Sequence, residues 1–201
     1  MRNMRTIGIT GGVGSGKTAI LSYIKEHCNC EVLLADQIAH EVCLPDGSCY
    51  HSLVKLLGEE ILEPDGRIHR GRMAARIFGD RELLTAVNQQ IHPAVKTVIL
   101  EKIEAYRAAG VRDFVFVEAA LLIEEGYGSL LDELWYIYAD ESVRRQRLKE
   151  SRGYSEEKIQ DIFRAQLTEE EFRKHCRFVL DNSRSLQEVF HQIDRKLEEY
   201  L

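Results

Sequence analysis

The sequence contains no apolar run long enough to cross a membrane. A membrane-spanning helix needs about 20 consecutive apolar residues, whereas the longest apolar candidate, residues 114–123, is short and is interrupted by Glu118. The first residues also lack the apolar core and the small-residue cleavage site of a signal peptide. We therefore expect a cytoplasmic protein with no membrane partner.

The cysteines and histidines lack the spacing of a metal or redox site. The five cysteines are odd in number, and they form neither a C-x-x-C pair nor a zinc-ribbon pattern. The histidines outside position 92 show no metal-ligand spacing. We expect reduced thiols, and histidines that lie on the surface or cap helices. These residues are Cys28, Cys30, Cys43, Cys49, Cys176, His27, His40, His51, His69, His175 and His191.

The chain also lacks an excess of positive charge. Its 27 Lys and Arg residues against 33 Asp and Glu residues give a net charge of −6 at pH 7. A field of this sign opposes binding to nucleic acid or to an anionic membrane surface. A chain of 201 residues buries enough surface to fold without disulfides or a structural metal. We expect one globular protein, a monomer or weak oligomer, with no nucleic acid partner.

Short apolar runs alternate with amphipathic helical patterns along the chain. The runs are rich in β-branched and aromatic residues, which is typical of strands buried on both faces of a parallel sheet. Strands that alternate with helices indicate an α/β fold with right-handed crossovers. The sequence therefore predicts a central parallel sheet of about five strands flanked by helices. The predicted strands are residues 6–10, 32–35, 114–117, 134–138 and 178–180.

Two signals predict where helices begin. Pro93 precedes an apolar stripe over residues 94–106, and proline is acceptable at the first position of a helix. Thr168 and Glu171 have the spacing of a capping box. We expect one helix to begin at Pro93 and two helices to lie within residues 155–176.

Residues 11–18 match the phosphate-loop pattern G-x-x-x-x-G-K-[ST] in full, after a predicted strand and before a predicted helix. Glycine lets the backbone turn with positive φ, so that successive N–H groups converge on phosphate oxygens at the helix N-terminus. Lys17 supplies a cation for the β and γ phosphates, and the Thr18 hydroxyl can bind Mg²⁺. The pattern predicts a P-loop NTPase fold. The expected ATP-binding residues here are Gly12, Val13, Gly14, Ser15, Gly16, Lys17, Thr18 and Ala19.

The pattern N-K-x-D, which recognises guanine in GTPases, is absent from the sequence. The chain also has no long second half like that of a mechanical ATPase. A small-molecule kinase is therefore the leading class.

Asp36 is the most informative residue outside the loop. It follows a predicted strand, and ligands of open parallel sheets bind at the carboxyl ends of strands. A carboxylate there can accept the proton of an acceptor hydroxyl and orient it for attack on the γ-phosphate. Asp is also a preferred helix N-cap residue, and the two interpretations are equally supported by this position alone.

Two further charged groups have candidate roles. Glu118 ends a predicted strand, where an acidic residue can hold Mg²⁺ through water; a carboxylate paired with a neighbouring backbone group or lysine is an equal alternative. Residues 144–152 hold five basic residues and one acidic residue. We interpret this cluster as part of a lid over residues 144–176, with Arg144 and Arg147 closing over phosphates. For any single arginine, a solvated helix face is the alternative.

Roughly 75 residues separate the second and third predicted strands, whereas a parallel crossover needs only about a dozen. Two Pro-Asp-Gly turns, at residues 45–47 and 64–66, punctuate this stretch. We predict a helical insertion over residues 45–109 that holds the substrate, within a nucleotide-binding core of residues 1–44 and 110–201. His92, in the insertion, is either a substrate ligand or part of a helix start.

Several segments together point to one family. Residues 34–42 are similar to an Asp-Ala-Asp segment, and residues 65–70, 77–78 and 91–93 are similar to a CoA-domain pattern. Residues 121–124 resemble a Pro-Leu-Leu-Phe-Glu stretch. With the phosphate loop, these segments make nearly the whole chain resemble the dephospho-CoA kinase family.

The resemblance implies ATP-dependent phosphorylation of the ribose 3′-hydroxyl of dephospho-CoA, the last step of CoA biosynthesis, with Mg²⁺ as cofactor. It raises Asp36 to the expected catalytic carboxylate. A kinase for another nucleoside, nucleotide or small metabolite is the nearest alternative, and a nucleotide-dependent regulatory switch is another. The implied roles are catalysis by Asp36 and Lys17, ATP binding by the loop with Arg144, Arg147 and Asn182, substrate binding by Asp36, Arg70 and His92, and Mg²⁺ binding by Thr18 and Glu118.

Overall fold

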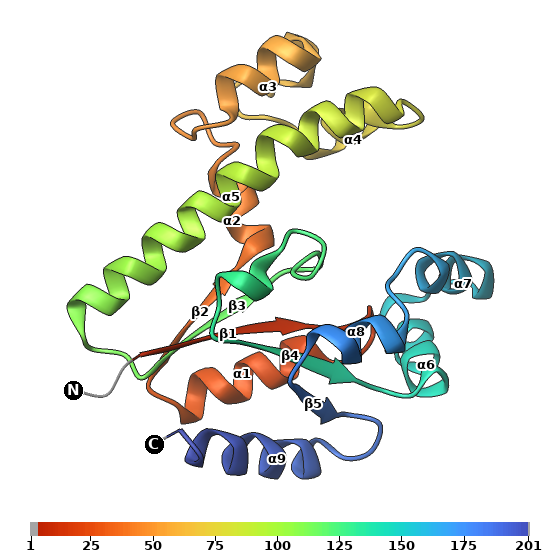
Figure 1. Cartoon of the computed structure of the whole chain (residues 1–201). Coiled ribbons are helices and arrows are strands. Elements are labelled where there is room, and N and C mark those ends of the chain that lie inside the picture. Colours follow the sequence, from red (N-terminus) through yellow and green to blue (C-terminus); the bar gives the residue numbers. More distant parts are fainter. Residues whose placement is uncertain (1–3, 201) are drawn as a thin grey trace. The chain divides into compact units, whose positions relative to one another are not determined.

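The computed structural model describes residues 4–200, which form two compact units (Figure 1). One unit is Leu33–Ala108, and the other combines the described residues on either side of it. No helix within residues 4–200 is long and apolar enough to cross a membrane.

A five-stranded sheet with the strand order β2-β3-β1-β4-β5 underlies the fold. β1 pairs in parallel with β3 and with β4, and β4 pairs in parallel with β5. The predicted α/β fold with a parallel five-stranded sheet is confirmed. The strands are β1 (Arg5–Thr10), β2 (Cys30–Leu34), β3 (Phe114–Glu118), β4 (Glu133–Tyr138) and β5 (Phe178–Asp181).

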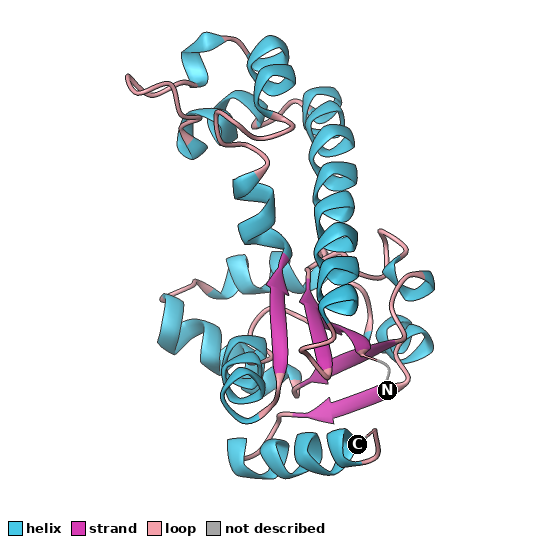
Figure 2. Ribbon diagram, turned by 90° about the vertical axis from the view of Figure 1, so that its left-hand side faces the viewer, coloured by secondary structure: helices cyan, strands magenta, loops and turns pink. Residues whose placement is uncertain are grey.

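The centre of the sheet is buried on both faces, as the continuous apolar runs predict. Three consecutive residues of β3, Val115, Phe116 and Val117, are fully buried. Successive side chains of a strand point to opposite faces, so burial of consecutive residues requires cover on both sides. Figure 2 shows helices flanking these strands.

The described residues of the unit that contains most of this sheet form five α-helices. Residues 155–176 form two of them, as predicted, and the second begins with a capping box between Thr168 and Glu171. α1 and α9 pack against each other, and α8 packs against β4. The five are α1 (Lys17–His27), α6 (Glu141–Arg152), α7 (Glu156–Arg164), α8 (Glu169–His175) and α9 (Leu186–Glu198).

The second unit is helical, and its longest helix corrects one prediction. Pro93 does not start a helix but lies inside α5 (Arg81–Ala109). An internal proline removes one backbone hydrogen bond, but one apolar stripe continues across it, with Val87 buried before the proline and Val95 buried after it. Packing of this stripe therefore offsets the loss of the backbone hydrogen bond at Pro93. The other α-helices among the described residues of this unit are α2 (Ala35–Glu41), α3 (Tyr50–Leu57) and α4 (Arg70–Ile77), and a short 3-10 helix, η1 (Glu59–Ile61), follows α3.

Candidate active site

The phosphate loop connects the carboxyl end of β1 to the start of α1. β1 lies between β3 and β4, where the strand order reverses, and ligands of such sheets bind at this point. Gly14 has φ +83° and Gly16, the N-cap of α1, has φ +91°. Residues with a Cβ rarely adopt these angles, which explains the glycines at both positions.

Side chains approach the loop so closely that a Cβ would not fit at two of its glycines. A Cβ on Gly12 would lie 2.3 Å from Arg144 Nη2, and one on Gly16 would lie 2.2 Å from Asn182 Nδ2. Asn182 follows β5 and is 1% exposed. The backbone of the loop is therefore in close contact with two polar side chains, those of Arg144 and Asn182.

The Lys17 side chain folds back onto the loop that precedes it. Its Nζ donates a hydrogen bond to the Gly11 carbonyl at 2.7 Å. The ammonium group thus lies beside the loop backbone, together with the first turn of α1. A flexible lysine at this place can move to a phosphate oxygen as a point charge.

Two arginines of α6 also contact the loop. Arg144 Nε donates to the Val13 carbonyl at 3.0 Å, and Arg147 Nη1 donates to the Ser15 carbonyl at 3.4 Å. Burial lowers the pKa of the Arg144 guanidinium, because a low-dielectric environment disfavours the charged form. A partly desolvated cation therefore lies beside the loop.

The other basic side chains of this helix are paired elsewhere. Arg145 forms ion pairs with Glu141 and Glu156, and Lys149 contacts Glu156 at 2.6 Å. Arg152 lies against the ring of Tyr154. The basic segment that appears uniform in the sequence is thus divided, with Arg144 and Arg147 directed to the loop and the other three basic residues to the helix surface.

The loop has features that suit a phosphate-bearing ligand. Ser15 Oγ and Asn182 Oδ1 are buried and have no hydrogen-bond partner among the described residues. Glycine backbone, a helix N-terminus and three basic side chains occur at the same place. These groups fit the triphosphate of ATP, whose oxygens accept hydrogen bonds and carry negative charge.

Thr18 and Glu118 offer oxygen ligands for Mg²⁺ in the same unit. Thr18 is exposed in the first turn of α1, and Glu118 ends β3 in register with Ile9 of β1. Within residues 4–200, no group of three or more His, Cys, Asp or Glu residues could hold a metal ion. A site with few protein ligands fits Mg²⁺, which commonly keeps several waters and binds substrate phosphates.

A pocket of about 280 Å³ lies in the second unit and includes Asp36. The N-cap of α2 is Leu34, and Asp36 is an exposed residue of the first helical turn. The N-cap interpretation of Asp36 is therefore wrong, because the helix begins earlier than that interpretation requires. Its carboxylate is instead accessible in a pocket.

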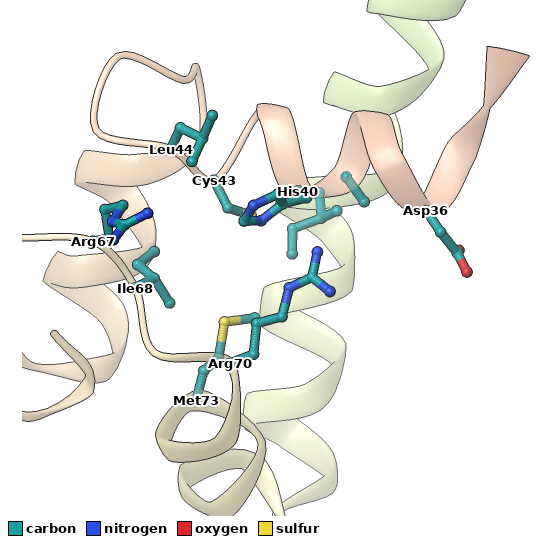
Figure 3. A pocket seen from close by; sticks show the side chains of 10 residues that line it. Asp36, His40, Cys43, Leu44, Arg67, Ile68, Arg70 and Met73 are labelled. Atoms are coloured by element: carbon teal, nitrogen blue, oxygen red, sulfur yellow. The ribbon is translucent and has the colours of Figure 1, made fainter. Parts of the chain in front are cut away.

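Figure 3 shows the side chains that accompany Asp36 in this pocket. His40 lies one helical turn along α2, and Arg70, at the start of α4, extends its guanidinium into the pocket. Cys43 is a further lining residue, and burial raises the pKa of its thiol to about 11. His92, a predicted substrate ligand, is not among the lining residues, although its neighbour Ile91 is.

Three residues that contact the site, His40, Cys43 and Gln166, carry no function predicted from the sequence. His40 was expected on the surface, and it is exposed, but it also lines the pocket with Asp36. Its position four residues after Asp36 in a helical segment could have identified it, since residues i and i+4 share a helix face. Gln166 accepts a hydrogen bond from Arg144 Nη2 at 2.6 Å, and no spacing rule connects two residues so far apart in sequence.

The parallel sheet and its phosphate loop define a P-loop nucleotide-binding protein. A sequence model of dephospho-CoA kinases matches residues 5–188. The chain belongs to the dephospho-CoA kinase family. A dephospho-CoA kinase of Carboxydothermus hydrogenoformans is 34% identical over 187 residues, which are 93% of this chain and 90% of that protein. The resemblance found in the sequence is therefore confirmed.

Solved structures show the same fold. The crystal structure of TT1252 from Thermus thermophilus is similar with a TM-score of 0.80 and 29% identity, over 98% of each chain. The dephospho-CoA kinase from Campylobacter jejuni aligns with a TM-score of 0.68 and 19% identity, over 98% of this chain and 97% of that one. The second comparison supports the fold alone.

Proposed function

We propose that this protein is a kinase that transfers the γ-phosphate of ATP to the 3′-hydroxyl of the ribose of dephospho-CoA, giving CoA and ADP. The observation that carries the proposal is family membership over nearly the whole chain together with an intact phosphate loop. The protein would act on a free small molecule in the cytoplasm, as a monomer or weak oligomer, without nucleic acid or membrane partners.

The nucleotide is held by the phosphate loop. Backbone amides of residues 12–19 and the Lys17 ammonium bind the β and γ phosphates, and Arg144, Arg147 and Asn182 complete the ATP site. Thr18 and Glu118 hold Mg²⁺, which supplies charge neutralisation at the phosphates when bound. The supporting observations are the close approach of Arg144 and Asn182 to the loop glycines and the buried Ser15 hydroxyl, which has no hydrogen-bond partner within residues 4–200.

The acceptor is held by the pocket that contains Asp36. The Asp36 carboxylate accepts the proton of the 3′-hydroxyl as that oxygen bonds to the γ-phosphorus, and the bond from the γ-phosphorus to the β,γ-bridging oxygen breaks so that ADP leaves. Arg70 in the same pocket attracts the anionic groups of the substrate, and His92 binds it from α5. The helical insertion over residues 45–109 holds the remainder of dephospho-CoA, and residues 144–176 act as a lid that excludes water, because water would otherwise compete as acceptor.

The test is Mg²⁺-dependent ADP release, measured with dephospho-CoA, nucleosides and nucleoside monophosphates as separate acceptors. We expect release only with dephospho-CoA, with one CoA formed for each ADP. CoA itself is the matched non-acceptor, because its 3′-hydroxyl already carries phosphate. Equal release with another acceptor would identify a different kinase, and slow release that no acceptor stimulates would identify a nucleotide-dependent switch.

A further inference from the structure

Side chains from two distant segments hold carbonyl oxygens of the phosphate loop. Arg144 Nε donates to the Val13 carbonyl at 3.0 Å. Asn182 Nδ2 donates to the Ser15 carbonyl at 2.7 Å, and Asn182 is almost fully buried. Two alternate peptide groups of the loop are therefore fixed by groups outside it.

A fixed carbonyl also fixes the next amide. In a trans peptide the C=O of one residue and the N–H of the following residue point in opposite directions within one plane. Holding the Val13 carbonyl therefore sets the direction of the Gly14 N–H, and holding the Ser15 carbonyl sets that of the Gly16 N–H. An amide that is oriented before the ligand arrives loses less conformational entropy on binding.

The Arg144 guanidinium is itself held in place by two residues of the α7 region. Gln166, in the turn between α7 and α8, accepts a hydrogen bond from Arg144 Nη2 at 2.6 Å. The Phe163 ring of α7 lies under the guanidinium, with 4.3 Å between Arg144 Cζ and the ring centroid. A planar guanidinium that is bonded at two nitrogens and stacked on one face has little freedom left.

We infer that Gln166 and Phe163 are positioning residues for nucleotide binding. They keep Arg144 on the Val13 carbonyl and so preset the Gly14 amide for a phosphate oxygen. Neither residue needs to touch the nucleotide. The inference rests on the proposed function only in taking ATP as the ligand of the loop.

The experiment compares Gln166→Leu with Gln166→Glu. Leucine has a similar size but accepts no hydrogen bond, whereas glutamate accepts one from Arg144 but cannot donate. We expect Gln166→Leu to weaken Mg²⁺–ATP binding about 5- to 10-fold in a calorimetric titration, since a lost hydrogen bond costs about 1 kcal/mol. Gln166→Glu should bind ATP within about 2-fold of the unmodified protein, because glutamate still accepts the hydrogen bond from Arg144.

Gln146→Leu is the matched control, because Gln146 is exposed on α6 and bonds only to Glu150 among the described side chains. It should leave ATP binding unchanged. Phe163→Leu keeps an apolar side chain but removes the ring face, and we expect it to weaken ATP binding about 3-fold, in line with the modest energy of a cation–π contact. This second variant tests the inference even if Gln166→Leu does not fold.

Hydrogen exchange gives a readout that a general loss of stability would not reproduce. In the nucleotide-free protein, Gln166→Leu should accelerate exchange at the Ser15 amide, which donates to the Gly12 carbonyl across the Val13 peptide, and leave the amides of β3 unchanged. The KM for ATP should rise while the KM for dephospho-CoA stays constant. The inference is overturned if Gln166→Leu binds ATP normally, if Gln166→Glu does not bind ATP like the unmodified protein, or if exchange at the Ser15 amide does not change.

The titration needs no acceptor. A protein that binds ATP in this way and does not phosphorylate dephospho-CoA would therefore refute the proposed function and leave the positioning roles intact.

Discussion

At the scale of single residues, Asp36 is the group on which the proposed chemistry depends most. It is exposed in the first turn of α2 and lines a pocket with Arg70. A carboxylate at this position can accept a proton from the acceptor hydroxyl.

Replacing Asp36 by Asn keeps the size of the side chain and removes the base. We expect turnover with dephospho-CoA to fall by about 10²-fold or more, the contribution typical of a general base, while ATP binding stays unchanged. Steady-state kinetics and an ATP titration measure the two effects. Asp113→Asn, at the opposite end of β3 from Glu118, is the control and should retain normal turnover; near-normal activity of Asp36→Asn would contradict the assigned role.

The residue scale also shows what the sequence could reveal of the site. The loop residues and Asp36 stand in contiguous segments, so they could be predicted as site residues from the sequence, the loop by its pattern and Asp36 by the family resemblance. The partners of Arg144 could not be found in this way, because Val13 and Gln166 reach it from distant segments and only the fold brings them together. The position of Asp36 alone left two interpretations open; the family resemblance favoured the catalytic carboxylate, and the start of α2 at Ala35 excludes the N-cap.

At the scale of elements, the phosphate loop depends on glycines with left-handed backbone. Gly16→Ala adds a methyl group at φ +91°, where Cβ would lie 2.2 Å from Asn182 Nδ2. We expect this variant to lose about 1–2 kcal/mol of folding free energy from backbone strain and, because Asn182 must move, to lose ATP affinity as well. Urea unfolding and an ATP titration measure the two losses.

Gly126→Ala is the matched control for this prediction. Gly126 has φ +71°, and a Cβ there would meet nothing within 4 Å. The control should show a similar loss of folding free energy and normal ATP affinity. If both variants bind ATP normally, the close contact between Gly16 and Asn182 is not needed for the site.

The elements differ in how well the sequence predicts them. The five strands were predicted to within about two residues at their ends, the usual ambiguity of such boundaries, because buried parallel strands have continuous β-branched and aromatic runs. The start of α5 was predicted wrongly, because the local sequence does not show whether Pro93 begins a helix or lies inside one. The helix continues through Pro93 because the apolar stripe on both sides of it is buried by tertiary packing.

At the scale of the whole molecule, charge is distributed unevenly. The net charge is −6, yet Lys17, Arg144 and Arg147 gather at one loop and the N-terminus of α1 adds its partial positive charge. A polyanionic ligand is therefore attracted locally by a protein that repels polyanions at long range. At the physiological Debye length of about 8 Å, the local charges dominate within the site.

Buried thiols give the whole molecule a pH dependence. Burial raises the pKa of Cys176 to about 12, and that of Cys43 to about 11. An unfolded thiol ionises near pH 8.5, so above this pH the folded state binds more protons than the unfolded state, and the free energy of unfolding must fall as pH rises toward the folded pKa values. We expect urea unfolding to show this decline from about pH 9 upward. Cys176→Ala should lower stability at neutral pH but make the decline with pH shallower. The control is Val189→Ala, which changes a buried residue without an ionisable group and should lower stability equally at every pH. Parallel curves for the unmodified protein and both variants would show that the thiols do not cause the decline.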